Sequence, residues 1–128
     1  MKPRLVIGLG NPFDAQDSIG VHVAHELADD PRFQEDVEFI RGGTDLLRLA
    51  PQLRDRQLII LVDAAASTLP PGQVIVREHG AADLCDRQFG AHHLSAVQAL
   101  DLLRWADESV ARAHCVWVLV TVAQLPSA

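Results

Sequence analysis

Three side chains, Asp17, Asp63 and His92, are of types that bind a divalent metal ion, and each lies beside an expected strand or helix end. Asp17 follows the glycine-containing stretch GLGNPFDAQ, Asp63 follows the apolar run LIILV, and His92 precedes an amphipathic segment. Two neighbouring carboxylates repel each other unless they share a proton or a cation. Together with an imidazole they suit a zinc- or nickel-like ion with open coordination positions. We therefore predict that these three residues form a metal-contacting site.

These residues can meet only if the segments around them alternate between strands and helices. Five apolar runs predict strands, at residues 5–9, 37–40, 58–62, 74–76 and 116–120. The third run has no polar alternation, as a buried parallel strand requires. Apolar residues at helical spacing predict helices over 17–28, from Thr44 through 49, and from His92 or His93 through 103. We expect Thr44 to cap the second helix and Pro51 to kink or end it.

The alternation predicts one α/β domain over residues 1–128, a three-layer sandwich with helices on both faces of a mostly parallel, five-stranded twisted sheet of the phosphorylase/hydrolase-like kind. The fourth strand, which follows the turn TLPPGQ, is expected to be a reversed edge strand. With a strand order starting 2-1-3, right-handed crossovers place the first helix on one face and the next two on the other. Because the last strand comes only a few residues before Ala128, we expect no terminal helix and an under-covered face.

The predicted site lies where the strand order reverses, because ligands of open α/β sheets bind there, beyond the carboxyl ends of the strands. The loop after the first strand carries Asp17, and the third strand is expected to end at Asp63. Gly10 and Asn11 are expected to let that loop turn tightly and to offer backbone groups to a substrate. Gly42 and Gly43 end the second strand near the same edge, either as a flexible turn or as substrate contacts.

Composition argues against several classes of protein. The net charge is −6 and Lys2 is the single lysine, so we expect no nucleic-acid surface. No apolar run approaches the roughly 18 residues of a membrane span, and no signal peptide is evident, so we expect no membrane insertion. Cys85 and Cys115 lack the paired spacing of a disulfide framework or thiolate zinc site. These features predict a soluble, cytoplasmic protein.

Five segments in order, GLGNPFDAQDSIGVHVAHEL, GGTDLL, LIILVDAAAS, PPGQV and HHLSAVQAL, resemble the nickel–iron hydrogenase maturation endopeptidases over nearly the whole chain. The resemblance implies removal of the C-terminal tail from a hydrogenase large-subunit precursor. It implies that Asp17, Asp63 and His92 contact nickel carried by that precursor, with zinc or cadmium as a surrogate ion. The family usually has an acid where this chain has Gln16, and it continues past the last strand into a further helix.

Other interpretations remain open. A relative that binds metal or partner without cleaving it is the main alternative. Peptidyl-tRNA hydrolase also opens with GLGNP, but it needs a histidine where this chain has Asp17. A phospho-receiver domain needs a lysine at the end of the last strand, which this chain lacks. An under-covered apolar face would be hidden in a homodimer.

Several residues also have simpler roles. Asp17 fits the N-cap of the first helix. His93 and the pair His22 and His25 are expected at the surface, because neighbouring residues diverge and the order H-x-x-H-E is not that of a zinc motif. Trp105 and Trp117 are expected in the core.

Overall fold

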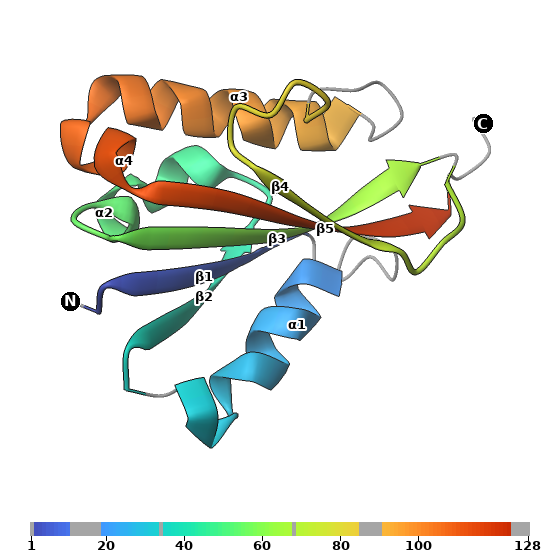
Figure 1. The fold of residues 1–128 in the computed structure, drawn as a ribbon, viewed down its shortest axis with the longest axis horizontal. Coiled ribbons are helices and arrows are strands. Elements are labelled where there is room, and N and C mark those ends of the chain that lie inside the picture. Colours follow the sequence, from blue (N-terminus) through green and yellow to red (C-terminus); the bar gives the residue numbers. More distant parts are fainter. Residues whose placement is uncertain (1, 11–18, 34, 68, 85–90, 124–128) are drawn as a thin grey trace.

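The computed structural model describes residues 2–10, 19–33, 35–67, 69–84 and 91–123 of the chain. These ranges form a sheet between two helical layers (Figure 1). The strands are β1 (Arg4–Leu9), β2 (Val37–Gly43), β3 (Leu58–Ser67), β4 (Val74–Glu78) and β5 (His114–Ala123). The helices are α1 (Ile19–Ala28), α2 (Ala50–Leu53), α3 (Ala91–Ala106) and α4 (Glu108–Arg112), with 3₁₀ turns η1 (Pro31–Phe33) and η2 (Leu46–Leu49). The predicted α/β sandwich is confirmed.

The five-stranded sheet has the order β2-β1-β3-β5-β4. β1 is parallel to β2 and β3, and β3 is parallel to β5. β4 is antiparallel to β5, so the prediction of a reversed edge strand is confirmed. α1 covers one face, and α2, α3 and α4 cover the other (Figure 1). The strand order therefore reverses between β1 and β3, as the 2-1-3 prediction requires.

The main core lies between the sheet and α3. Alternate residues of the central strands, Leu5, Ile7, Ile59, Leu61 and Trp117, are completely buried there. They belong to one cluster with the α3 residues Val97, Leu100 and Leu103. The prediction for Trp117 is confirmed. The prediction for Trp105 is wrong, because it follows Leu103 by two residues, falls on the outer side of α3, and is 86% exposed.

Two predicted element boundaries are also wrong. Asp63 does not end the third strand: β3 continues to Ser67 because residues 63–67 pair with Leu119–Ala123 of β5. Thr44 is not the cap of the following helix. Asp45 takes that position, and its carboxylate accepts a hydrogen bond from the backbone N–H of Leu47 at 3.1 Å. Pro51 lies in the first turn of α2, where a missing N–H costs nothing.

A chain of side-chain hydrogen bonds, buried at Trp117 and exposed at Asp101, attaches α3 to the sheet. The indole N–H of Trp117 donates to Nδ1 of His79 at 3.0 Å, and Nε2 of His79 lies 2.6 Å from the carboxylate of Asp101 on α3. Because an indole can only donate, the imidazole proton belongs on Nε2, which donates to Asp101. The position of α3 over β5 is therefore fixed by directional bonds as well as by apolar packing.

On the other face, the first turn of α1 rests directly on strand backbone. A Cβ on Gly20 would collide with the carbonyl oxygens of Leu9 and Val62, and a Cβ on Gly8 would collide with that of Gly20. Close approach of this kind needs glycine on both sides. It brings the start of α1 to the end of β1 and to the middle of β3, just before Asp63.

The same face is less covered beyond β3. Val62 pairs with Val118, and Val118 pairs with Val76 at the β4 edge, so the three share the face that α1 covers at β1. Val74 and Val76 are 63% and 56% exposed. Within the described ranges, no helix covers β4 on this face (Figure 1). The expectation of an under-covered face agrees with this exposure.

We predict that Gly20→Ala lowers the free energy of unfolding by roughly 1–3 kcal/mol, because its methyl group would displace backbone that cannot move aside cheaply. Urea denaturation followed by circular dichroism measures the change. Glu26→Ala, at an exposed position of the same helix, is the control and should stay within about 0.5 kcal/mol of the wild type. Equal stability of the two variants would contradict the direct packing of α1 on the strands.

Candidate active site

Asp63 lies where two strands part. The pairing of β1 with β3 ends at Gly8 and Val62, and from Asp63 onward β3 continues with β5. Asp63 is 6% exposed, so its carboxylate is largely removed from bulk solvent. Because alternate strand residues share a face, Asp63 lies on the α3 side, together with Leu61 and Ala65. The topology therefore places a buried acid at the reversal point of the strand order.

Two glycines hold the ends of β1 and β2 together beside this acid. The backbone N–H of Gly10 donates to the carbonyl of Gly43 at 2.7 Å. Gly10 has φ 129° and Gly43 has φ 64°, conformations that favour glycine. Both residues line the pocket described below. A side chain at either position would strain the turn that shapes this edge.

Gly42 has a different position from its neighbour. It is buried, and an added Cβ would lie 2.6 Å from Ile7 and 2.7 Å from Leu9 side-chain atoms. Gly42 is not among the pocket-lining residues, and the structure gives it a packing role. Its assignment as a substrate contact stays a prediction.

A pocket of about 260 Å³ opens beside Asp63. Its walls come from the ends of β1 and β2, from η2 and from the first half of α3. The lining residues are Leu9, Gly10, Gly43, Thr44, Asp45, Leu46, Leu47, Asp63, Ser95, Ala96 and Ala99. Most of the described lining is apolar, and Asp45 and Asp63 are the charged residues among it. A partly enclosed apolar pocket with a few polar groups is typical of ligand sites.

The structure brings together three of the predicted site residues, Asp63, Gly10 and Gly43. Asp17 and Asn11 lie outside the described residues. His92 lies in the first turn of α3, and its side chain is also outside the described part. Ser95 and Ala96 come one turn later and line the pocket, so α3 begins at this site. Among the described residues, no three potential ligands cluster, and the metal-contacting trio stays a prediction.

The sequence placed the start of α3 at the site through His92, but it did not indicate that η2 and the next turns of α3 would line the pocket. Asp45 was part of the segment GGTDLL but carried no assigned role, and Ser95, Ala96 and Ala99 are small residues within a helical pattern. Small residues on a helix leave room for a ligand only when the neighbouring element lies at some distance from the helix. The spacing of apolar residues in the sequence does not give that distance.

Cys115 is buried beneath α3, away from the pocket lining. Burial raises the pKa of its thiol, and the nearby Arg104 guanidinium, 3.2 Å from Sγ, partly opposes that rise. The thiol is therefore neutral at physiological pH and a poor nucleophile. Within the described pocket wall, the hydroxyls of Thr44 and Ser95 and the two carboxylates are the side chains capable of polar chemistry.

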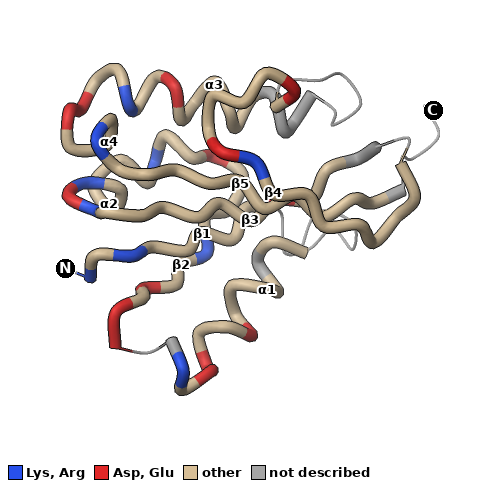
Figure 2. The backbone as a smooth tube through the Cα atoms, in the orientation of Figure 1, with Lys and Arg blue, Asp and Glu red and all other residues tan. Residues whose placement is uncertain are grey.

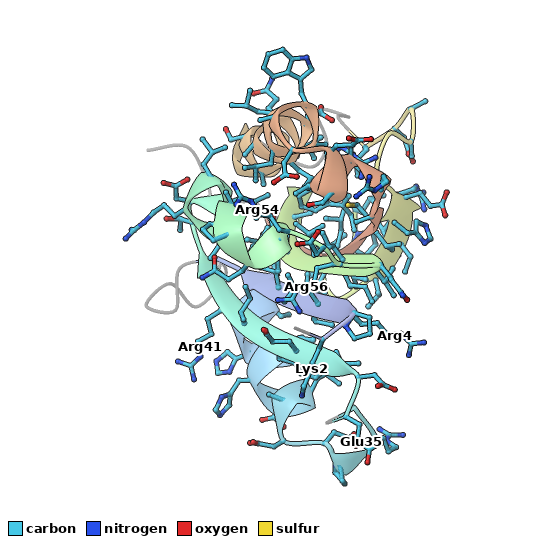
Figure 3. The ribbon with its side chains drawn as sticks, turned by 90° about the vertical axis from the view of Figure 1, so that its left-hand side faces the viewer. Lys2, Arg4, Glu35, Arg41, Arg54 and Arg56 are labelled. Carbon is cyan, nitrogen blue, oxygen red and sulfur yellow. The ribbon has the colours of Figure 1, made fainter. Side chains whose placement is uncertain are left out.

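None of the described lysines and arginines is among the residues that line the pocket. Figure 2 shows Lys and Arg interspersed with Asp and Glu over several elements. Figure 3 labels Lys2, Arg4, Arg54 and Arg56 at the end where β1 and β3 begin. Arg56 is buried and donates to Lys2 O at 2.7 Å and to Glu38 at 3.1 Å, while Arg54 pairs with Asp107 at 2.8 Å. Both guanidinium groups are thus used internally.

A parallel sheet with a buried carboxylate and a pocket at its reversal point defines an α/β domain of the enzyme type. None of the helices in the described ranges has the length and hydropathy that crossing a bilayer requires. The sequence profile described as HycI, hydrogenase maturation protease, matches residues 21–126. The chain belongs to the hydrogenase maturation protease family.

Individual relatives agree with this assignment. The hydrogenase 2 maturation protease of Escherichia coli K12 is 28% identical over 106 residues, which are 81% of this chain and 65% of that protein. The chain thus spans about two thirds of the length of this curated relative. Among solved structures, the [NiFe] hydrogenase maturation protease HybD from Thermococcus kodakarensis is 26% identical with a TM-score of 0.80, covering 98% of this chain and 82% of that one. The Escherichia coli endopeptidase HybD is 24% identical with a TM-score of 0.77, covering 98% and 77%, and shows the same fold.

Proposed function

We propose that this protein is an endopeptidase that removes the C-terminal tail of a nickel–iron hydrogenase large-subunit precursor. The observation that carries the proposal is the buried carboxylate of Asp63, at the switch point of a chain that belongs to the hydrogenase maturation protease family. The pocket beside it can receive part of a polypeptide substrate. The location proposed for this activity is the cytoplasm, in keeping with the free thiol of Cys115.

In the proposed mechanism, Asp17, Asp63 and His92 contact nickel that the precursor already holds. The metal belongs to the substrate and acts as the recognition element, so that the scissile bond is brought to the cleft only after nickel insertion. Zinc or cadmium can replace nickel as a probe of this trio. Water is the nucleophile, activated either by the metal or by a carboxylate acting as general base. Gly10, Asn11, Gly42 and Gly43 are proposed to contact the substrate backbone.

Cleavage of a nickel-loaded precursor tests the proposal. We expect mass spectrometry to show loss of the C-terminal tail, and Asp63→Asn to slow this loss by roughly 10²–10⁴-fold, the range for a group in proton transfer. Asp36→Asn, which changes an exposed carboxylate outside the pocket lining, should cleave at the wild-type rate. If the wild type leaves the precursor intact while the Escherichia coli hydrogenase 2 protease cuts a matched precursor, the protease proposal fails. Binding without cleavage would then favour the alternative of a non-cleaving relative.

Metal binding by the isolated protein is a separate prediction. Calorimetric titration with cadmium should give one ion per chain. Asp63→Asn should weaken this binding by more than the roughly 10–100-fold that loss of an outer hydrogen-bond partner costs, because a direct contact is removed. Asp45→Asn should leave the stoichiometry unchanged. An unchanged affinity in Asp63→Asn would contradict a role for this carboxylate at the metal.

We also propose that the protein forms a homodimer through the apolar face that includes Val74 and Val76. The two exposed valines lie on the edge strand β4, and half-buried Val116 and Val118 lie beside them on β5. An exposed apolar edge of this kind is commonly buried by association with another chain. Light scattering should give twice the monomer mass, and Val76→Glu should give a monomer, because the charge would be buried at the interface. Leu102→Glu, at a similarly exposed position on α3, should remain dimeric. A wild-type monomer would contradict the proposal.

A further inference from the structure

β3 continues past the strand that flanks it on one side. Its pairing with β1 ends at Gly8 and Val62, while its pairing with β5 runs without a break to the last residue of the strand. Figure 1 shows β3 and β5 extending beyond the end of β1. Gly10, which follows β1, is bonded to Gly43 of β2 instead. Within the described ranges, no strand lies beside the last residues of β3 on the β1 side.

The pairing with β5 shows which backbone groups of β3 face this side. Thr121 of β5 directs its N–H and its carbonyl to the two residues that precede β4. In a parallel pair the residue opposite such a position is the one bonded across the ladder, so Ala65 is bonded to β5. Successive residues of a strand direct their backbone groups to opposite sides. The N–H and carbonyl groups of Ala64 and Ala66 therefore face the side where β1 has ended.

The beginning of β3 follows the same alternation. Leu58, an even-numbered residue like Ala64 and Ala66, donates its N–H to the carbonyl of Pro3 at 3.2 Å, on the β1 side. No backbone partner for Ala64 or Ala66 is found on that side in the part of the chain that the structure describes. The backbone groups of these two alanines form an open edge of the sheet. Such an edge is a template for another extended chain.

The open edge begins one residue after Asp63. Ala64 is half-buried on the face that α1 covers, and Ala65 is buried on the α3 side. Because alanine side chains are short, they do not obstruct a strand that approaches in the plane of the sheet. A chain that lies along the open edge passes directly beside the carboxylate that is proposed to act in cleavage.

The chemistry of the open edge fits an extended polypeptide. Its donor and acceptor groups recur every second residue, about 7 Å apart, and this is the repeat of another β-strand. Peptides that add a strand to a sheet obtain much of their affinity from such main-chain hydrogen bonds. A small ion or metabolite would bond to one of the two alanines and leave the other unpaired. The substrate of an endopeptidase is a polypeptide, so it supplies the matching groups.

We propose that an extended segment of the substrate polypeptide binds as an additional strand along the open edge, with its backbone bonded to Ala64 and Ala66. This inference rests on the proposed endopeptidase function. Recognition through backbone groups makes binding depend on an extended shape more than on side-chain identity. It also holds the segment beside Asp63.

Hydrogen exchange tests the proposal at single residues. The ¹⁵N-labelled protease is mixed with nickel-loaded precursor, given a D₂O pulse shorter than one turnover, quenched and read by NMR. In the free protein the amides of Ala64 and Ala66 should exchange fast and that of Ala65 slowly. With free precursor at about 100 times its dissociation constant, the amides of Ala64 and Ala66 should exchange roughly 100-fold more slowly, because only unbound protein exposes them. The amide of Ala65 should stay slow in both states.

Proline substitutions provide a second measurement. Ala66→Pro removes an N–H of the open edge and places its ring where the added strand would lie, so it should weaken precursor binding by roughly 5-fold or more. Its Tm should stay near that of the wild type, because proline is tolerated where a strand N–H faces an edge. Ala65→Pro should lower the Tm clearly, because it removes a bond to β5. Glu78→Pro, whose N–H faces the outer edge of β4 by the same alternation, is the matched control and should bind the precursor like the wild type.

The outcomes separate this inference from the protease function. Cleavage with unchanged exchange at Ala64 and Ala66 would overturn the inference alone. Slow exchange of these amides in the free protein would also overturn it, because this chain or a second copy would already fill the edge. Slowed exchange on binding without cleavage would support the inference and contradict the protease proposal. A precursor that neither binds nor is cleaved would overturn both.

Discussion

The arrangement of the site depends on the backbone contact that the first turn of α1 makes with the end of β1 and the middle of β3. Gly20 lies so close to the carbonyls of Leu9 and Val62 that no side chain fits between them. Those two residues directly precede Gly10 and Asp63, which line the pocket. The same glycine contact that packs the helix therefore sets the spacing of the crevice where the strand order reverses. The same contact therefore determines both the packing of α1 on the sheet and the positions of Gly10 and Asp63. A substitution that loosens this packing is expected to move these two residues as well.

The opposite side of the pocket is held by a different kind of interaction. α3 supplies Ser95, Ala96 and Ala99 to the wall, and the bonds from Trp117 through His79 to Asp101 tie this helix to β5. Apolar packing is non-directional and would tolerate sliding of the helix along the sheet. Hydrogen bonds are directional, so this chain favours one position of the helix along the sheet. The pocket thus lies between a wall fixed by backbone contact and a wall fixed by directional bonds.

Much of the fold could be predicted from short stretches of sequence, because the apolar runs that mark the strands consist of residues that are buried in the sheet. The uninterrupted run LIILV was the clearest signal of a buried central strand, and its position placed Asp63 at the reversal point. The extension of β3 through Ala64–Ser67 was not predictable locally, since alanine and serine have low β-propensity and are strand here because they pair with β5. Trp105 was misassigned because hydrophobicity alone does not say which side of a helix faces the sheet. The pocket wall was missed because it depends on the distance between η2 and α3. Sequence patterns do not contain that distance.

The two ends of the sheet use charge in opposite ways. Where β1 and β3 begin, the guanidinium of Arg56 is buried and fully committed to Lys2, Gln52 and Glu38, so it stabilises the fold and is not available to a ligand. At the switch point of the strand order, Asp45 and Asp63 line an open pocket, and none of its described lining residues is basic. A charge in a partly enclosed pocket acts more strongly on a ligand than the same charge in bulk water. The two ends therefore differ in what their charges do: the buried guanidinium holds the fold together, and the carboxylates face the space that a ligand would enter.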